Sequence, residues 1–120
     1  MAAYDDAQGV TAEFNKNVLH VLDRSLGADF DPDAFAHVAV WDAEHEWIEM
    51  HLHAERAMTV QVDRLGLTVR FERGERMCTE ISAKFRPAGI RDLFTAAGFT
   101  LTRMWTDPDD RHALSLATAV

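Results

Sequence analysis

The chain has 120 residues, of which 48% are hydrophobic and 27% charged, a composition typical of one small globular domain. The formal net charge of −8 argues against nucleic-acid binding, which requires clustered Lys and Arg, and no apolar run approaches the roughly 20 residues of a membrane span. The N-terminus has no signal-peptide pattern, and the single cysteine, Cys78, fits a reducing compartment. We therefore expect a cytoplasmic protein that binds neither nucleic acid nor membrane.

A helix is predicted over residues 6–26, followed by a short turn. Gly27 stands where helices often end in a left-handed residue, and Asp31-Pro32-Asp33 is typical of an N-cap with proline at the first helical position. The apolar stripe recurs every fourth residue, at Val10, Phe14, Val18, Leu22 and Leu26, and Leu19 and Val21 widen it. The polar residues Asn15, Lys16, Asn17 and Asp23 are assigned to the solvent side of this amphipathic helix.

Strands follow, and their pattern predicts an antiparallel meander with one apolar face. Residues 47–55 alternate: Ile48, Met50, Leu52 and Ala54 share one face, and Glu49, His51, His53 and Glu55 share the other. The predicted strands cover residues 37–41, 47–55, 58–62, 67–71 and 75–85.

The C-terminal part predicts one more helix and a hairpin. Pro87 opens the helix and Gly98 ends it, with a buried stripe of Ile90, Leu93, Phe94 and Ala97. Two strands, residues 100–105 and 112–118, are joined by a turn at residues 107–110. On the first strand, strict alternation groups Leu101, Arg103 and Trp105 on one face. The overall class is α+β.

Glu80 and Ser82 are the first candidates for binding chemistry. Alternation places Cys78, Glu80, Ser82 and Lys84 on one face of the strand over residues 75–85. A carboxylate beside a hydroxyl matches a planar ring that offers an N–H and a second polar nitrogen, such as imidazole. The alternative is a solvated strand face on which Glu80 pairs with Lys84 or Arg76.

His51 and His53 are candidates for metal ligands, flanked by Glu49 and Glu55. No third His or Cys stands at a diagnostic spacing, so the sequence alone predicts no metal site. Cys78 is expected to be a small buried or half-buried side chain, because its sequence neighbours do not clearly supply the local base and positive potential that a nucleophile needs.

Several short segments resemble the histidine-specific, S-adenosylmethionine (SAM)-dependent methyltransferases of ergothioneine biosynthesis. The resemblance runs in order from residue 3 to about residue 117. It is carried by segments such as Ala3-Tyr4-Asp5-Asp6, Trp47-Ile48-Glu49-Met50, Thr79-Glu80-Ile81-Ser82 and Trp105-Thr106-Asp107-Pro108.

The resemblance implies four substrate-binding residues. Tyr4 would help to hold the carboxylate of histidine, while Met50, Glu80 and Ser82 would line the imidazole pocket. Residues 1–85 would form part of the substrate lobe, and residues 86–120 would be the helix and hairpin that complete the sheet of the SAM domain in the family.

The SAM-binding core itself has no counterpart in these residues, since no Gly-rich turn of the kind used by doubly wound domains is present. The chain alone is therefore expected to bind no cofactor, to carry no catalytic residue and to bind L-histidine weakly. It is expected to form a homodimer or to pair with a SAM-domain chain. The alternative is a stand-alone ligand-binding or protein-interaction module derived from the family.

Overall fold

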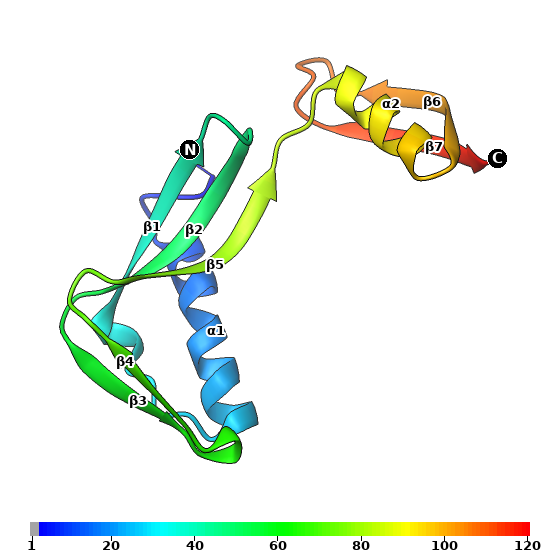
Figure 1. The fold of residues 1–120 in the computed structure, drawn as a ribbon. Helices are drawn as coiled ribbons and strands as arrows, with labels where there is room; N and C mark the ends of the chain where they lie inside the picture. The colour runs from blue at the N-terminus through cyan, green and yellow to red at the C-terminus, as the bar shows by residue number, and fades with distance from the viewer. Residues whose placement is uncertain (1–2) are drawn as a thin grey trace. The chain divides into compact units, whose positions relative to one another are not determined.

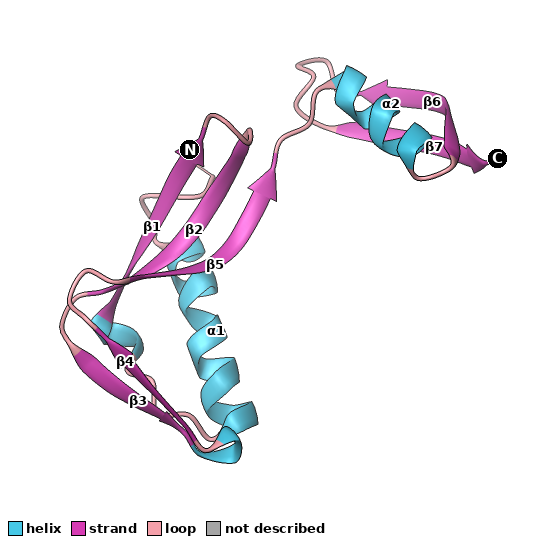
Figure 2. Cartoon of the chain, in the orientation of Figure 1, coloured by secondary structure: helices cyan, strands magenta, loops and turns pink. Residues whose placement is uncertain are grey.

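The structure, a computed structural model, describes residues 3–120, and the chain divides into the units Met1–Lys84 and Phe85–Val120. Both units combine helix with antiparallel strands (Figures 1 and 2). The predicted α+β class is confirmed. Within the described residues, no helix has both the length and the apolar character needed to cross a bilayer.

Helix α1 (Val10–Leu26) begins four residues later than predicted. Gly9 precedes it in the left-handed conformation, with φ of 74°, and this conformation interrupts the helical path. The Asp6 carboxylate accepts hydrogen bonds from the backbone N–H groups of Val10, at 3.0 Å, and Thr11, at 2.8 Å. These bonds satisfy donors that a helix start leaves unpaired. The helix ends, as predicted, at a left-handed Gly27.

The buried face of α1 is rotated away from the predicted stripe. Val10, Phe14 and Val21 of the predicted stripe are 64%, 65% and 41% exposed, whereas Leu19 is buried as predicted and Asn15 is buried beside it. The prediction failed because a strict four-residue repeat advances by about 40° per step on a helix of 3.6 residues per turn. When the repeat is traced back from Leu26, its first residues therefore no longer lie on the face of the helix that packs against the strands. The assignment of Asn15 to the solvent side is also wrong.

Strands β1 (Phe35–Asp42), β2 (Trp47–Ala54) and β5 (Arg76–Ala83) form one antiparallel sheet in the order β1-β2-β5. The hairpin of β3 (Met58–Val62) and β4 (Leu67–Phe71) lies between β2 and β5 in sequence and pairs separately. The strands therefore depart from a simple meander, because β5 pairs with β2 rather than with β4. The short 3-10 turn Pro32–Ala34 begins at Asp31, whose carboxylate accepts from the Asp33 N–H as the sequence predicts.

The core of the first unit lies where α1 meets the sheet and the β3–β4 hairpin. Leu19, Phe35 and Leu52 are at most 1% exposed. Phe35 and Phe71 pack edge to face, with ring centroids 5.4 Å apart, a preferred aromatic geometry. The predicted apolar face of β2 is confirmed, because alternate residues from Ile48 to Ala54 are buried.

A β-bulge interrupts strand β5 at Thr79. Met50 of β2 stands opposite Glu80, and the next residue, His51, stands opposite Cys78. Thr79 therefore has no partner across the pair, which is the arrangement of a bulge. Residues directly opposite one another project to the same face of a sheet, so the bulge reverses the alternation along β5.

The bulge separates Cys78 from the two predicted site residues. Glu80 and Ser82 lie opposite Met50 and Ile48, on the face that carries the core, whereas Cys78 lies on the other face. Cys78 is exposed there, so the prediction that it is buried or half-buried is wrong. The prediction that all three share a face is wrong, because strict alternation does not allow for an extra residue. Glu80 and Ser82 still project side by side, as predicted.

The second unit consists of α2 (Pro87–Ala96) and a hairpin of β6 (Phe99–Thr106) and β7 (Ala113–Ala119). Within its helix, Ile90 and Phe94 are half-buried, while two members of the predicted buried stripe are exposed: Leu93, to 56%, and Ala97 at the helix end. Phe94 contacts Phe99, with ring centroids 6.5 Å apart. Among the residues of α2, none is fully buried.

The hairpin of the second unit also contains a bulge. Leu101 stands opposite Ala117, and Arg103 stands opposite Leu116, so no residue of β7 is in register with Thr102. Trp105 and Arg103 therefore share a face that does not include Leu101, contrary to the predicted alternation. This face, which also carries Leu114 and Leu116, is exposed: Trp105, Leu114 and Leu116 are 40%, 69% and 51% accessible.

Candidate amino-acid-binding site

Three polar side chains meet at the end of β5. The Tyr4 hydroxyl lies 2.8 Å from Ser82 Oγ, although 78 residues separate the two in sequence. Lys84 Nζ donates to Ser82 Oγ at 2.8 Å and to the Tyr4 hydroxyl, and it lies 4.5 Å from the centre of the Tyr4 ring. The hydrogen bond from Lys84, followed by that from Ser82, lowers the pKa of Tyr4 below its usual value of 10.0.

Met50 and Glu80 form the adjoining part of the same face. Met50 is 3% exposed and stands opposite Glu80, which is exposed. Within residues 3–120 the Glu80 carboxylate has neither a hydrogen-bond donor nor a cation as partner, because Lys84 contacts Tyr4 and Ser82 instead. The alternative in which Glu80 pairs with Lys84 or Arg76 is therefore not observed. An exposed carboxylate with unused lone pairs is free to accept a donor from a ligand.

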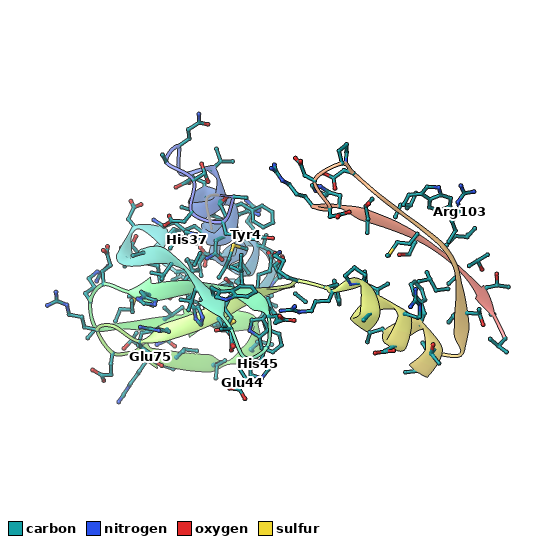
Figure 3. All side chains as sticks on the ribbon, turned by 90° about the horizontal axis from the view of Figure 1, so that it is seen from above. Tyr4, His37, Glu44, His45, Glu75 and Arg103 are labelled. Atoms are coloured by element: carbon teal, nitrogen blue, oxygen red, sulfur yellow. The ribbon has the colours of Figure 1, made fainter. Side chains whose placement is uncertain are left out.

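A buried network, which the sequence analysis missed, holds these elements together. His37 Nε2 lies 2.8 Å from the Tyr4 carbonyl oxygen, and Figure 3 labels both residues where their segments approach. Asn15 Nδ2 donates to His37 Nδ1 at 2.9 Å. Since Nδ1 accepts, Nε2 carries the proton and donates to Tyr4.

The amide oxygen of Asn15 accepts a hydrogen bond from the bulge residue Thr79. Asn15 Oδ1 lies 2.5 Å from Thr79 Oγ1, which also lies 2.9 Å from the Met50 carbonyl oxygen. Asn15 is only 3% exposed, and burial without partners would be costly for its amide. One side chain thus links the Tyr4 segment, through His37, to the bulge that turns Glu80 toward Met50. The signal in the sequence is the four-residue spacing of Asn15 and Leu19, which are the two buried positions of α1.

The four residues predicted for substrate binding therefore lie on one face of the first unit. Tyr4 contacts Ser82, and Glu80 is the cross-strand neighbour of Met50. This arrangement offers a carboxylate, a hydroxyl, an apolar wall and a phenol next to an ammonium group. Such a set matches a zwitterionic amino acid with a polar ring.

Comparison with known proteins shows the protein family to which the chain belongs. Residues 1–119 match the family of SAM-dependent, histidine-specific methyltransferases, and the chain belongs to this family. It is 54% identical over 115 residues to a histidine N-alpha-methyltransferase of Mycolicibacterium smegmatis, covering 96% of the chain and 36% of the relative. The corresponding protein of Mycobacterium tuberculosis is 53% identical over the same length and coverage. The predicted family is confirmed, and the chain spans 36% of the length of these relatives.

SAM, the cofactor of the family, does not fit the described residues on their own. A doubly wound SAM or nucleotide domain uses a Gly-rich turn after a parallel strand. All strand pairs within residues 3–120 are antiparallel. The glycines with positive φ are Gly9, Gly27, Gly66, Gly74 and Gly98, and they stand singly at separate turns and helix ends.

Proposed function

We propose that this chain supplies the amino-acid-binding part of an L-histidine Nα-methyltransferase of ergothioneine biosynthesis. Such an enzyme transfers methyl groups from SAM to the α-amino nitrogen of histidine and gives trimethylhistidine (hercynine). The observation that carries the proposal is the grouping of Met50, Glu80 and Ser82 on one sheet face, with Tyr4 bonded to Ser82. Sequence identity above 50% to two histidine methyltransferases supports it.

Each residue has a separate role in this proposal. Glu80 accepts a hydrogen bond from a ring N–H of histidine, and Ser82 contacts the other ring nitrogen. Met50 packs against the ring, for which a flexible and polarisable side chain is well suited. Tyr4 holds the substrate carboxylate, and Lys84 adds a positive charge next to the Tyr4 hydroxyl.

The direct Tyr4–Ser82 hydrogen bond implies a movement when the substrate binds. Tyr4 and Ser82 are assigned to opposite ends of histidine, yet their oxygen atoms are 2.8 Å apart. The carboxylate and the imidazole of histidine are separated by two carbon atoms and cannot both enter this space. We therefore infer that the ligand replaces the Tyr4–Ser82 bond and displaces the Tyr4 segment from β5.

The chain alone is proposed to be inactive and to bind histidine weakly. The chain spans 36% of the length of its relatives, and in this proposal the remainder of such a protein holds the nucleoside and the methyl group of SAM. The role of these 120 residues is to orient the amino acid, so that its amine meets a methyl group held elsewhere.

Calorimetry with histidine and SAM, separately and together, tests this proposal. We expect no SAM binding, and weak histidine binding that Glu80→Ala weakens by about 1.5–3 kcal/mol, the usual size for a hydrogen bond to a charged group. Glu44→Ala is the matched control, because Glu44 is an exposed residue of the turn between β1 and β2. Unchanged histidine affinity in Glu80→Ala would contradict the imidazole contact. Micromolar SAM binding would contradict the proposal that SAM is held by residues outside this chain.

A second candidate is a stand-alone ligand-binding or protein-interaction module derived from the family. The exposed face of the β6–β7 hairpin, formed by Trp105, Leu114 and Leu116, favours it, since apolar patches of this kind often bind other chains. A reading frame that encodes a SAM domain directly upstream of this sequence would instead favour the first proposal, in which the chain is part of an enzyme. We place either form in the cytoplasm, because a single unpaired cysteine suits a reducing compartment.

The partner of this hairpin is proposed to be a second copy of the chain or a SAM-domain chain. An isolated two-stranded hairpin is marginally stable in water, and its open edges favour pairing with another strand. A two-fold dimer would cover the same apolar face on both copies.

A further inference from the structure

The strand end that carries Glu80 and Ser82 continues into a positively charged residue. Ser82 and Lys84 follow Glu80 at steps of two positions, which is about 7 Å for each step in an extended chain. The backbone of Lys84 is held in place, because its N–H donates to the Glu46 carbonyl oxygen at 2.8 Å. A carboxylate, a hydroxyl and an ammonium group therefore follow one another along this segment.

Lys84 contacts Ser82 and Tyr4 rather than a carboxylate. Its Nζ donates to Ser82 Oγ at 2.8 Å and to the Tyr4 hydroxyl, and it forms no ion pair within the described residues 3–120. The hydrogen bond from Lys84 is the largest cause of the lowered pKa of Tyr4, while the charge of Glu80 acts on that pKa in the opposite direction. Both charges thus reach the same small region of the face, and they are not paired with each other.

Glu80 raises a question of selectivity for the proposed pocket. A carboxylate accepts N–H donors of any kind, and it binds a guanidinium, through two parallel hydrogen bonds, more strongly than a neutral imidazole. Met50 adapts to ligands of many shapes, and the Ser82 hydroxyl can accept a hydrogen bond as well as donate one. None of these three residues disfavours arginine, so a preference for histidine requires a further group.

We propose, on the basis of the histidine-binding function proposed above, that Lys84 excludes cationic side chains from this pocket and thereby makes it selective for a neutral ring. Any ligand atom that contacts Ser82 Oγ also comes close to the Lys84 ammonium, which is bonded to that oxygen at 2.8 Å. A second cation at this point would be repelled, and repulsion between like charges is an effective way to reject a wrong ligand.

A neutral imidazole avoids this repulsion. It has one N–H, which matches the acceptor Glu80, and one lone pair, which matches the O–H of Ser82. Lys84 favours this arrangement, because its N–H occupies a lone pair of Ser82 Oγ and polarises the Ser82 hydroxyl as a donor. A guanidinium has only N–H donors and would place one positive charge beside another. The three groups thus select the ligand side chain by its hydrogen-bonding pattern and by its charge.

The test compares the affinities of the purified chain for L-histidine and L-arginine. Both ligands carry the same α-amino and carboxylate groups, so contacts with these groups cancel in the ratio of the two affinities. NMR titrations of the isotope-labelled chain suit weak binding, and they are made at about pH 8, where a free imidazole with its usual pKa of about 6.5 is neutral. The wild type should prefer histidine. Lys84→Met should shift the ratio toward arginine by about tenfold or more, since a like-charge contact is removed.

The controls separate charge from size and from folding. Lys84→Arg keeps the positive charge and should retain the wild-type preference for histidine. Lys16→Met removes the other lysine of the chain, which lies on α1, and should leave the ratio unchanged. L-Citrulline replaces the guanidinium of arginine by a neutral urea group of similar shape, so its affinity relative to histidine should not rise in Lys84→Met. Lys84 is exposed, so these variants are expected to fold normally.

These measurements distinguish failure of the selectivity role from failure of the proposed function. Equal affinities of the wild type for histidine and arginine, an unchanged ratio in Lys84→Met, or an equal gain for citrulline and arginine would overturn the role of Lys84 and leave the histidine pocket standing. A wild-type chain that binds no histidine would refute the proposed function, and the selectivity role of Lys84 with it. A gain for arginine alone, lost again in Lys84→Arg, is the result that supports the proposal.

Discussion

The two units of the chain differ in how completely each buries its own apolar residues. In the first unit, Leu19 and Leu52 are fully inaccessible, and an aromatic group that includes Phe35 and Phe71 packs between the helix and the strands. In the second unit, α2 has no buried residue, and Leu114 and Leu116 are largely exposed. The first unit thus has the core of an independently stable domain, while the second leaves most of its apolar side chains exposed.

The largest expected effect is the loss of a core side chain from the first unit. Leu52→Ala removes a fully buried side chain from β2 and should lower the free energy of unfolding by about 2–5 kcal/mol. The matched change in the second unit, Leu114→Ala, affects a side chain that is 69% exposed and should cost less than about 0.5 kcal/mol. Urea unfolding of both variants measures the difference, and equal effects would refute the contrast between the units.

The buried network is the next most sensitive feature. Asn15→Ala removes the amide that joins His37 to Thr79 and should destabilise the first unit by about 1–3 kcal/mol, the cost of leaving buried partners unsatisfied. It should also weaken histidine binding, because the bulge that turns Glu80 toward Met50 loses its hydrogen bond to α1. Asn17→Ala, on the exposed side of α1, is the control and should leave urea unfolding and binding unchanged. An Asn15→Ala variant as stable as the control would show that the network contributes nothing.

The exposed hairpin face predicts self-association of the second unit. Light scattering at tens of micromolar should give twice the chain mass of 13.5 kDa. Leu116→Glu places a charge on this face and should weaken the dimer by about tenfold or more, which corresponds to about 1.4 kcal/mol. Glu72→Gln, an exposed position of the first unit, should not change the mass. A wild-type mass of 13.5 kDa would rule the dimer out.

The sequence predicted which elements exist better than it predicted which way their side chains face. Both helices and all seven strands that the structure describes in residues 3–120 occur near their predicted positions, because apolar periodicity and Gly or Pro punctuation act locally. The predicted faces are wrong at Thr79 and Thr102, where an extra residue shifts the register. They are also wrong on α1, where a strict four-residue repeat does not match the period of the helix. Register depends on the partner strand, which a local pattern does not contain.

The candidate site was predicted from a resemblance, and its supporting residues were not. Strand alternation predicts that Glu80 and Ser82 are neighbours on one face, but their pairing with Met50 and Ile48 depends on the partner strand. The sequence does not indicate that Asn15 is buried, because the local sequence pattern around a buried amide on a helix is the same as around one that faces solvent. His37 and Thr79 supply those partners from two different strands.

The smallest predicted effect concerns the N-terminus of α1. The backbone N–H groups of Thr11 and Val10 hydrogen-bond the Asp6 carboxylate and lower its pKa from 3.8 to about 2. A carboxyl group with a lowered pKa in the folded state contributes stability that is fully present above its unfolded pKa. The contribution is lost as the pH falls from 3.8 through about 2, when the carboxyl becomes protonated in the folded protein as well.

Asp6→Asn tests this contribution, because the amide keeps an acceptor oxygen but loses the charge. The variant should be slightly less stable than the wild type at pH 7, and the difference should shrink as the pH falls toward 2, where the wild-type carboxyl is also neutral. Asp5→Asn, one residue earlier, serves as the control for a general change in net charge. Thermal unfolding of the three proteins at several pH values measures the effect. A difference that stays constant from pH 7 to pH 2 would show that the charge of Asp6 does not stabilise the helix start.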